Sequence, residues 1–169
     1  MPVAFKSALD DSECKLEPIR VGKPLNRQGS HDIHLIIETE RTPVLRIDLY
    51  TDLECCAFQD AQIWRDLILI GYGESLHLVN PKSKTSKTII LEGYFGHIYL
   101  FDNFALIASA LDLQKISPDG EVVWKSSPLG IDGVIVEGIQ NDFIVGQGEW
   151  DPPGGWKPFR LNLNSGAIN

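Results

Sequence analysis

The sequence has few cysteines and no long apolar run. Its three cysteines are an odd number, and Cys55 and Cys56 are adjacent, which argues against a disulfide framework and favours a reducing compartment. The longest apolar stretch, residues 104–111, is far shorter than the ~18–20 residues that a membrane-spanning helix needs. The first fifteen residues lack the basic and apolar regions of a secretion signal. We therefore expect a cytoplasmic protein with no membrane segment, folded as one domain over residues 1–169.

Basic side chains are scarce in the second half of the chain. The net charge is −8, and residues 92–151 hold ten acidic side chains against only Lys115 and Lys125. Affinity for nucleic acid comes from Lys and Arg contacts with phosphates, so this composition argues against a nucleic-acid partner. It favours a basic protein as partner.

Catalytic and metal-binding motifs are also lacking. The segment Gly73–His77 is close to a nucleophile elbow, but it has histidine where the second glycine belongs. His31 and His34 are three residues apart, which places them on opposite faces of a strand and not around one metal ion. We expect no metal, no cofactor and no catalytic residue, and the sequence points away from an enzyme.

A faint internal repeat is present. An Asp or Asn followed by an apolar run recurs at Asp32, Asp66, Asn103 and Asp142, with spacings of 34, 37 and 39 residues. A second strand-like segment follows each run, and these segments are Val44 to Tyr50, Leu76 to Asn80, Leu111 to Ser117 and Phe159 to Leu163. Short strands and turns with a period near 37 are typical of four-stranded antiparallel blades. We predict an all-β fold of four propeller-like antiparallel blades.

One unit also resembles a known family. The stretch Ile116–Trp124, with Gly120 in a turn and Trp124 four residues later, resembles the blade motif of quinoprotein-type and related bacterial β-propellers. The resemblance covers about residues 62–166. It implies repeated β-blades, and it carries no cofactor or catalytic residue to this chain.

Four units can form either a closed four-bladed ring or an open stack. The segment 1–30 is predicted to be partly irregular, and we predict that residues 15–21 pair beside the last unit and close the ring. If the ring is open, a bare edge favours a homodimer over a monomer. Two helical alternatives remain, one over residues 103–115, which follow a plausible N-cap, and one over residues 4–15.

The connections at one end of the blades form the candidate site. The connections that we assign to this end contain several acidic residues. One of them, residues 148–158, is a long insertion rich in Pro and Gly that contains two tryptophans. The residues predicted to bind a partner are Glu40, Glu74, Asp112, Glu149, Trp150, Asp151 and Trp156. Trp150 and Trp156 could instead plug the end of the fold, or stack on a carbohydrate.

The leading hypothesis is a non-catalytic binding module whose acidic, Trp-bearing face engages a basic protein, in the manner of an immunity protein or adaptor. The alternative is a carbohydrate-binding protein, or a small hydrolase or lyase that uses the loop carboxylates. The sequence itself does not name the partner.

Overall fold

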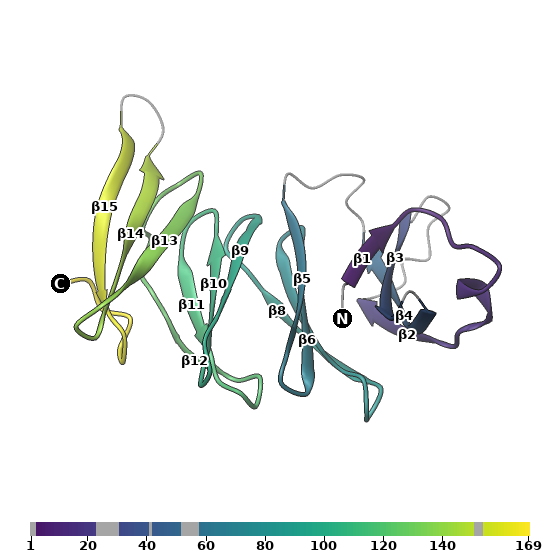
Figure 1. Cartoon of the computed structure of the whole chain (residues 1–169). Coiled ribbons are helices and arrows are strands. Elements are labelled where there is room, and N and C mark those ends of the chain that lie inside the picture. Colours follow the sequence, from purple (N-terminus) through teal and green to yellow (C-terminus); the bar gives the residue numbers. More distant parts are fainter. Residues whose placement is uncertain (1–2, 23–30, 41, 52–57, 151–153) are drawn as a thin grey trace.

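The computed structural model describes residues 3–22, 31–40, 42–51, 58–150 and 154–169. These residues form strands and one short 3₁₀ turn, Glu13–Lys15, so the predicted all-β class is confirmed. The strands make four sheets, which we call A to D in chain order. Figure 1 shows the sheets side by side in an open row, with sheet A at one end and sheet D at the other.

The strands of each sheet are nearly consecutive in the chain. Sheet A contains β1 (Val3–Lys6), β2 (Pro18–Gly22), β3 (His31–Thr39) and β4 (Thr42–Thr51), in the spatial order β1-β3-β4-β2. Sheet B contains β5 (Gln59–Trp64), β6 (Leu67–Tyr72), β7 (Ser75–Asn80) and β8 (Thr85–Ile90). Sheet C contains β9 (Phe95–Leu100), β10 (Ala105–Ser109), β11 (Leu113–Ile116) and β12 (Val122–Lys125). Sheet D contains β13 (Val134–Gln140), β14 (Phe143–Trp150) and β15 (Gly155–Asn162).

The two middle sheets are buried on both faces, which explains the continuous apolar runs. In β6, Ile68 and Ile70 pack against sheet A, while Leu69 between them packs against sheet C. In β10, Ile107 faces sheet B and Leu106 faces sheet D. Successive side chains of a strand point to opposite faces, so only a strand covered on both sides has apolar residues at every position.

Among the described residues, sheet D is covered on one face only. Ile144 of β14 is fully buried against sheet C, whereas its neighbours Phe143 and Val145 are half-buried on the outward face. Ile135 of β13 is 39% exposed on that side. In the part of the chain that the structure describes, the outward face of sheet D is therefore accessible to solvent at this end of the row.

Tryptophans connect successive sheets across the row. The Trp64 indole of sheet B donates to the carbonyl oxygen of Phe101 at 2.8 Å, and the Trp124 indole of sheet C donates to the carbonyl oxygen of Leu163 at 3.0 Å. Both indoles are otherwise buried in the cores between sheets. Each Trp thus combines a large apolar contact with a satisfied N–H group.

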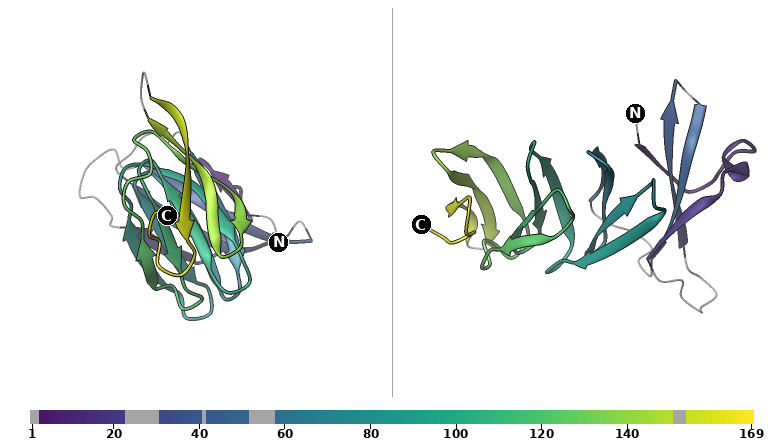
Figure 2. Two further views of the ribbon diagram at one scale, coloured as in Figure 1. Left: turned by 90° about the vertical axis from the view of Figure 1, so that its left-hand side faces the viewer. Right: turned by 90° about the horizontal axis from the view of Figure 1, so that it is seen from below.

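The predicted ring closure is wrong. Strand β2 pairs in parallel with β4 inside sheet A, from Pro18 beside Arg46 to Gly22 beside Tyr50, and not with the last unit. Strand β1 and the C-terminal residues lie far apart along the row in Figure 1 and in the right-hand view of Figure 2. The described residues contain no closed ring of sheets, so the open stack is the alternative that the structure matches.

Both helical alternatives are also wrong. Residues 105–109 form β10, because this segment is sandwiched between two sheets and burial overrides helix propensity. Residues 4–15 contain most of β1 and the 3₁₀ turn. Residues 53–58, which we also predict to form a strand, fall largely outside the described residues.

The Asp/Asn signal marks real turns in three of the four units. Asp66, Asn103 and Asp142 stand in the connections directly before β6, β10 and β14. Asn141 and Asp142 have φ values of 48° and 62°, which is the conformation that a two-residue hairpin turn requires. Asp32 differs, because it lies inside β3 and pairs with Tyr50.

Burial of His77 predicts a loss of stability in mild acid. The side chain lies inside sheet B, 6% exposed, with Nδ1 2.9 Å from the Thr88 hydroxyl, and burial lowers its pKa from 6.5 to about 4. Between pH 6.5 and pH 4 the unfolded chain therefore binds a proton at His77 that the folded chain does not bind. The contribution of neutral His77 to the free energy of unfolding is complete above pH 6.5 and is lost as pH falls toward 4. Its size is about 3 kcal/mol.

We expect His77→Gln to remove this pH dependence. Urea unfolding at pH 7 and pH 4.5 measures it, with exposed His97→Gln as the control. An equal loss of stability in wild type and His77→Gln would contradict the assignment.

Candidate functional site

Backbone hydrogen bonds join the connections at one end of sheets B, C and D into a continuous surface, which we call the upper ledge. Its first bonds run from Leu91 N to Glu74 O at 2.9 Å and from Phe95 N to Gly73 O at 2.6 Å. Its next bonds run from Ala110 N to Tyr94 O, from Gly133 N to Ala110 O and from Glu149 N to Gly133 O, all at 2.8–2.9 Å. Side chains on this ledge are therefore held by a fixed backbone.

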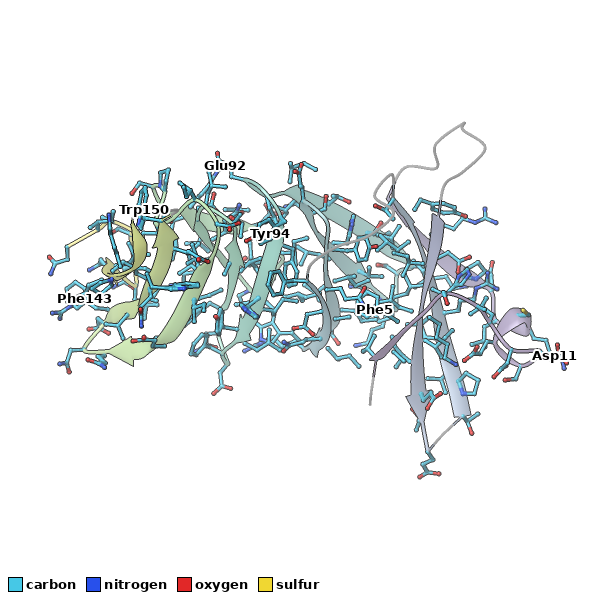
Figure 3. The ribbon with its side chains drawn as sticks, turned by 90° about the horizontal axis from the view of Figure 1, so that it is seen from above. Phe5, Asp11, Glu92, Tyr94, Phe143 and Trp150 are labelled. Atoms are coloured by element: carbon cyan, nitrogen blue, oxygen red, sulfur yellow. The ribbon has the colours of Figure 1, made fainter. Side chains whose placement is uncertain are left out.

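Figure 3 looks down on the ledge. It shows Glu92, Tyr94 and Trp150 along it, with Phe143 at the sheet D end of the row and Asp11 at the opposite end. The ledge therefore spans sheets B to D and stops at the open end of the molecule.

Four side chains lie where the ledge reaches sheet D, and we call them the terminal site: Tyr94, Asp132, Glu149 and Trp156. Gly133 forms the base of the terminal site. A β-carbon placed on Gly133 would lie 3.4 Å from Trp156 Cη2, 3.9 Å from Glu149 Oε2 and 4.0 Å from Tyr94 Oη. These three atoms therefore surround one small space above the Gly133 backbone.

The Tyr94 hydroxyl ties the third sheet to the fourth. It donates to the backbone oxygen of Asp132 and lies 3.0 Å from Asp132 Oδ1. Burial, this hydrogen bond and the negative charges of Asp132 and Glu149 raise the pKa of Tyr94 to about 12. The phenol therefore stays neutral and acts as a fixed donor, while the negative charge of the site belongs to the two carboxyl groups.

The local structure explains how these side chains are presented. Glu149 and Trp156 are directly opposite each other on β14 and β15, so they share one face of sheet D. Asp132 precedes β13 in the connection from sheet C, and its amide points to the Glu149 carbonyl oxygen at 3.3 Å. Trp156 is 43% exposed, which leaves much of its ring available for contact.

Four of the predicted site residues have accessible side chains on or beside the ledge: Glu74, Glu149, Trp150 and Trp156. Glu74 is exposed in the turn between β6 and β7. Glu149 and Trp156 belong to the terminal site. Trp150 is half-buried, and the Lys157 ammonium lies 5.5 Å from the centre of its ring, so it is already covered by a cation.

The other predicted residues differ from the expected exposed common face. Asp112 stands in a ledge turn but is completely buried, and Glu40 is at the tip of the β3–β4 hairpin. Figure 2 shows that this hairpin projects sideways from the row, whereas the β14–β15 hairpin projects upward, because sheet A is rotated relative to the others. Asp151 lies outside the described residues.

The neighbours of Asp112 explain why its carboxyl group is buried. The Ser109 hydroxyl donates to its Oδ1 at 3.0 Å, and Lys125 Nζ is 3.3 Å from its Oδ2 without the geometry of a hydrogen bond. Burial raises the pKa of Asp112, against the opposing effects of Ser109 and Lys125. The carboxyl group therefore stabilises the β10–β11 turn and is not a surface charge.

Tyr94 and Asp132 were missed by the sequence reasoning. Both lie in connections between sheets, next to the unpredicted strands β9 and β13. Tyr94 also begins a row of rings: its centre is 5.8 Å from that of Phe58, which is 5.8 Å from His97, which in turn is 6.0 Å from Tyr99. The aromatic residues around Tyr94 and His97 were the one available signal.

A second polar cluster lies on sheet A. Asp48 Oδ1 is 2.8 Å from both His34 Nδ1 and Arg46 Nε, and Arg46 Nη2 donates to Asp48 Oδ2. Burial alone would raise the pKa of Asp48, but the hydrogen bonds from Arg46 and His34 hold it below its ordinary value. The carboxylate is thus neutralised by its own neighbours and presents no free charge.

Other kinds of site are not visible in the described parts of the chain. There, no three His, Cys, Asp or Glu side chains are grouped so that they could hold a metal ion. A groove of about 220 Å³ lies between sheets B and C at the end opposite the ledge, lined by Leu67, Leu78, Lys87 and Asp119 among others. Within the described ranges, no helix has the length and apolar character needed to cross a bilayer.

The chain matches no protein-family model, and no curated protein shows significant similarity to it. The terminal site is therefore interpreted from its own chemistry.

Proposed function

We propose that this protein is a non-catalytic, cytoplasmic binding module that engages a basic protein through the terminal site and the adjoining outward face of sheet D. The observation that carries the proposal is the exposed Trp156 ring beside the Glu149 carboxyl group, with the Asp132 carboxyl group next to the Tyr94 hydroxyl of the same site. Exposed tryptophans next to fixed polar groups are typical anchors of protein interfaces.

The surroundings of Trp156 support a protein partner. Gln147 of β14 pairs with Ile135 on β13 and with Pro158 on β15. All three lie on the face of sheet D that also presents Glu149 and Trp156. Apolar side chains beside carboxyl groups match the usual anatomy of an interface, and the carboxyl groups of the terminal site would attract and orient a basic surface.

The ledge increases this acidic character. Glu74 and Glu92 are exposed along it, in addition to the two acids of the terminal site. Lys125 forms an ion pair with Glu92 and offsets part of this negative charge. Association with a basic partner should therefore be fast at low ionic strength and should weaken as salt is added.

A second candidate function, carbohydrate binding, rests on one observation. The rings of Phe58, Tyr94 and His97 form a partly exposed row beside the terminal site. Sugar rings stack on such surfaces, and this binding would not depend on salt.

Quantitative capture from an extract of the producing cells tests the proposal. Wild type should retain a basic protein, with retention falling between 50 and 300 mM salt, and purified partner should bind Trp156→Ala about 30-fold more weakly because an interface Trp contributes ~2 kcal/mol. Glu149→Gln should weaken binding mainly through slower association.

The matched controls are Ile90→Ala, which removes an exposed apolar side chain from β8, and Glu121→Gln, which removes an exposed acid just before β12, at the end of the sheets away from the ledge. Both should bind as wild type does. Retention of the same partner by Trp156→Ala and Glu149→Gln at wild-type levels would refute the assignment of the terminal site.

A further inference from the structure

We propose that the terminal site binds the guanidinium group of an arginine side chain supplied by the partner. This inference rests on the proposed function and names the chemical group that the site recognises. Three features of the molecule support it: the cations that cover other rings of sheet D, the acids of the site that lack an ion pair, and the free carboxylate oxygens beside Trp156 and Tyr94.

Two half-buried rings of sheet D are covered by cations from the chain itself. The Arg160 guanidinium carbon lies 4.0 Å from the centre of the Phe143 ring, and Lys157 Nζ lies 5.5 Å from that of Trp150. Trp156 is more exposed than either ring, and among the described residues no cation lies over it. Tryptophan is the aromatic side chain that attracts cations most strongly, so Trp156 offers an unused cation–π surface.

The acids beside Trp156 also lack a cation. Elsewhere on the molecule, Glu92 is paired with Lys125 and Glu121 with Lys87. In the described parts of the chain, no Lys, Arg or His forms an ion pair with Asp132 or Glu149. Two negative groups and an open aromatic ring therefore meet at one place with no positive charge of their own.

The available hydrogen-bond acceptors suit a planar donor. Tyr94 occupies Asp132 Oδ1, which leaves Oδ2 of that residue, and the Glu149 carboxylate has no hydrogen-bond partner among the described side chains. A guanidinium group can stack on an indole and donate in its own plane to carboxylates, whereas the ammonium of lysine is a compact point charge. The site therefore favours arginine over lysine.

Nuclear magnetic resonance with capped amino acids tests this inference directly on the folded wild-type protein. The probes are acetyl-arginine amide, acetyl-lysine amide and acetyl-citrulline amide, the last being similar in shape to arginine but uncharged. The observed signals are the indole N–H of Trp156, assigned with Trp156→Phe, and the backbone N–H of Gly133.

Arginine should shift both signals with millimolar affinity, lysine should bind at least threefold more weakly, and citrulline should cause no saturable shift. Glu149→Gln and Asp132→Asn should each weaken arginine binding at least threefold, while Glu121→Gln should not change it.

The outcomes separate the two proposals. Equal binding of arginine and lysine, or equal binding of citrulline, overturns the inference but leaves a basic partner possible. Absence of any shift at Trp156 also overturns it, while the capture experiment decides independently whether the proposed function stands.

Discussion

Gly148→Ala is expected to destabilise the protein by about 3 kcal/mol or more, the upper end of the usual range for overpacking. Gly148 lies in β14 where sheet D contacts the connection from sheet C. A β-carbon on it would lie 1.9 Å from the Leu129 carbonyl oxygen and 2.6 Å from its carbon. These are backbone atoms, and Leu129 is itself tied to Leu111 by a 2.7 Å hydrogen bond, so the clash cannot be relieved by rotating a side chain.

Gly138→Ala is the matched control for this prediction. It changes a glycine of the neighbouring strand β13, where no atom lies within 4 Å of the added β-carbon. Its stability should stay within about 1 kcal/mol of wild type, or rise slightly because alanine restricts the unfolded chain. Urea unfolding measures both variants, and a Gly148→Ala protein as stable as Gly138→Ala would show that sheets C and D do not approach as described.

Trp124→Ala is expected to cost about 3–5 kcal/mol, as for other large-to-small core substitutions. The indole is 8% exposed, packs in the core between sheets C and D, and donates to the Leu163 carbonyl oxygen. Trp124→Phe keeps most of the ring packing and should lose mainly the hydrogen bond, at about 1 kcal/mol.

The loss of stability in Trp124→Ala should be greatest in sheet D. Sheet D is held by one neighbour, so hydrogen exchange of β15 should accelerate in Trp124→Ala while β6, between two sheets, stays protected. Exchange that rises equally in β6 and β15 would contradict a row of sheets that opens from its end.

The strands that are buried on both faces were predictable from the sequence. The apolar runs of β6 and β10 stand out because both faces are covered, and their Asp/Asn turns follow from backbone conformation. Strands β5 and β9 were not predicted as first strands of their sheets, because they lie at sheet edges and mix polar with apolar residues, as in the segment Gln59–Trp64. Edge position depends on the assembled sheets, which a single strand does not reveal.

The candidate site was predictable only in part. Glu149 and Trp156 were named because their insertion is unusual in the sequence. Asp132 was not, because its contact with Tyr94 arises from the packing of sheet D on sheet C. Asp112 was expected to be exposed, but Ser109 and Lys125 allow its burial, and Glu40 is separated by the rotation of sheet A, which no local pattern encodes.

The open row is the claim on which the terminal site depends, because a closed ring would place sheet A against the outward face of sheet D. The direct test is a distance between spin labels on Cys14 and Ser165→Cys, both exposed, in a variant with Cys55→Ser and Cys56→Ser. Neighbouring sheets stack about 10 Å apart, so three steps along the row predict a separation of about 30 Å or more. A distance of roughly 10–20 Å, as expected if sheets A and D were neighbours, would contradict the account.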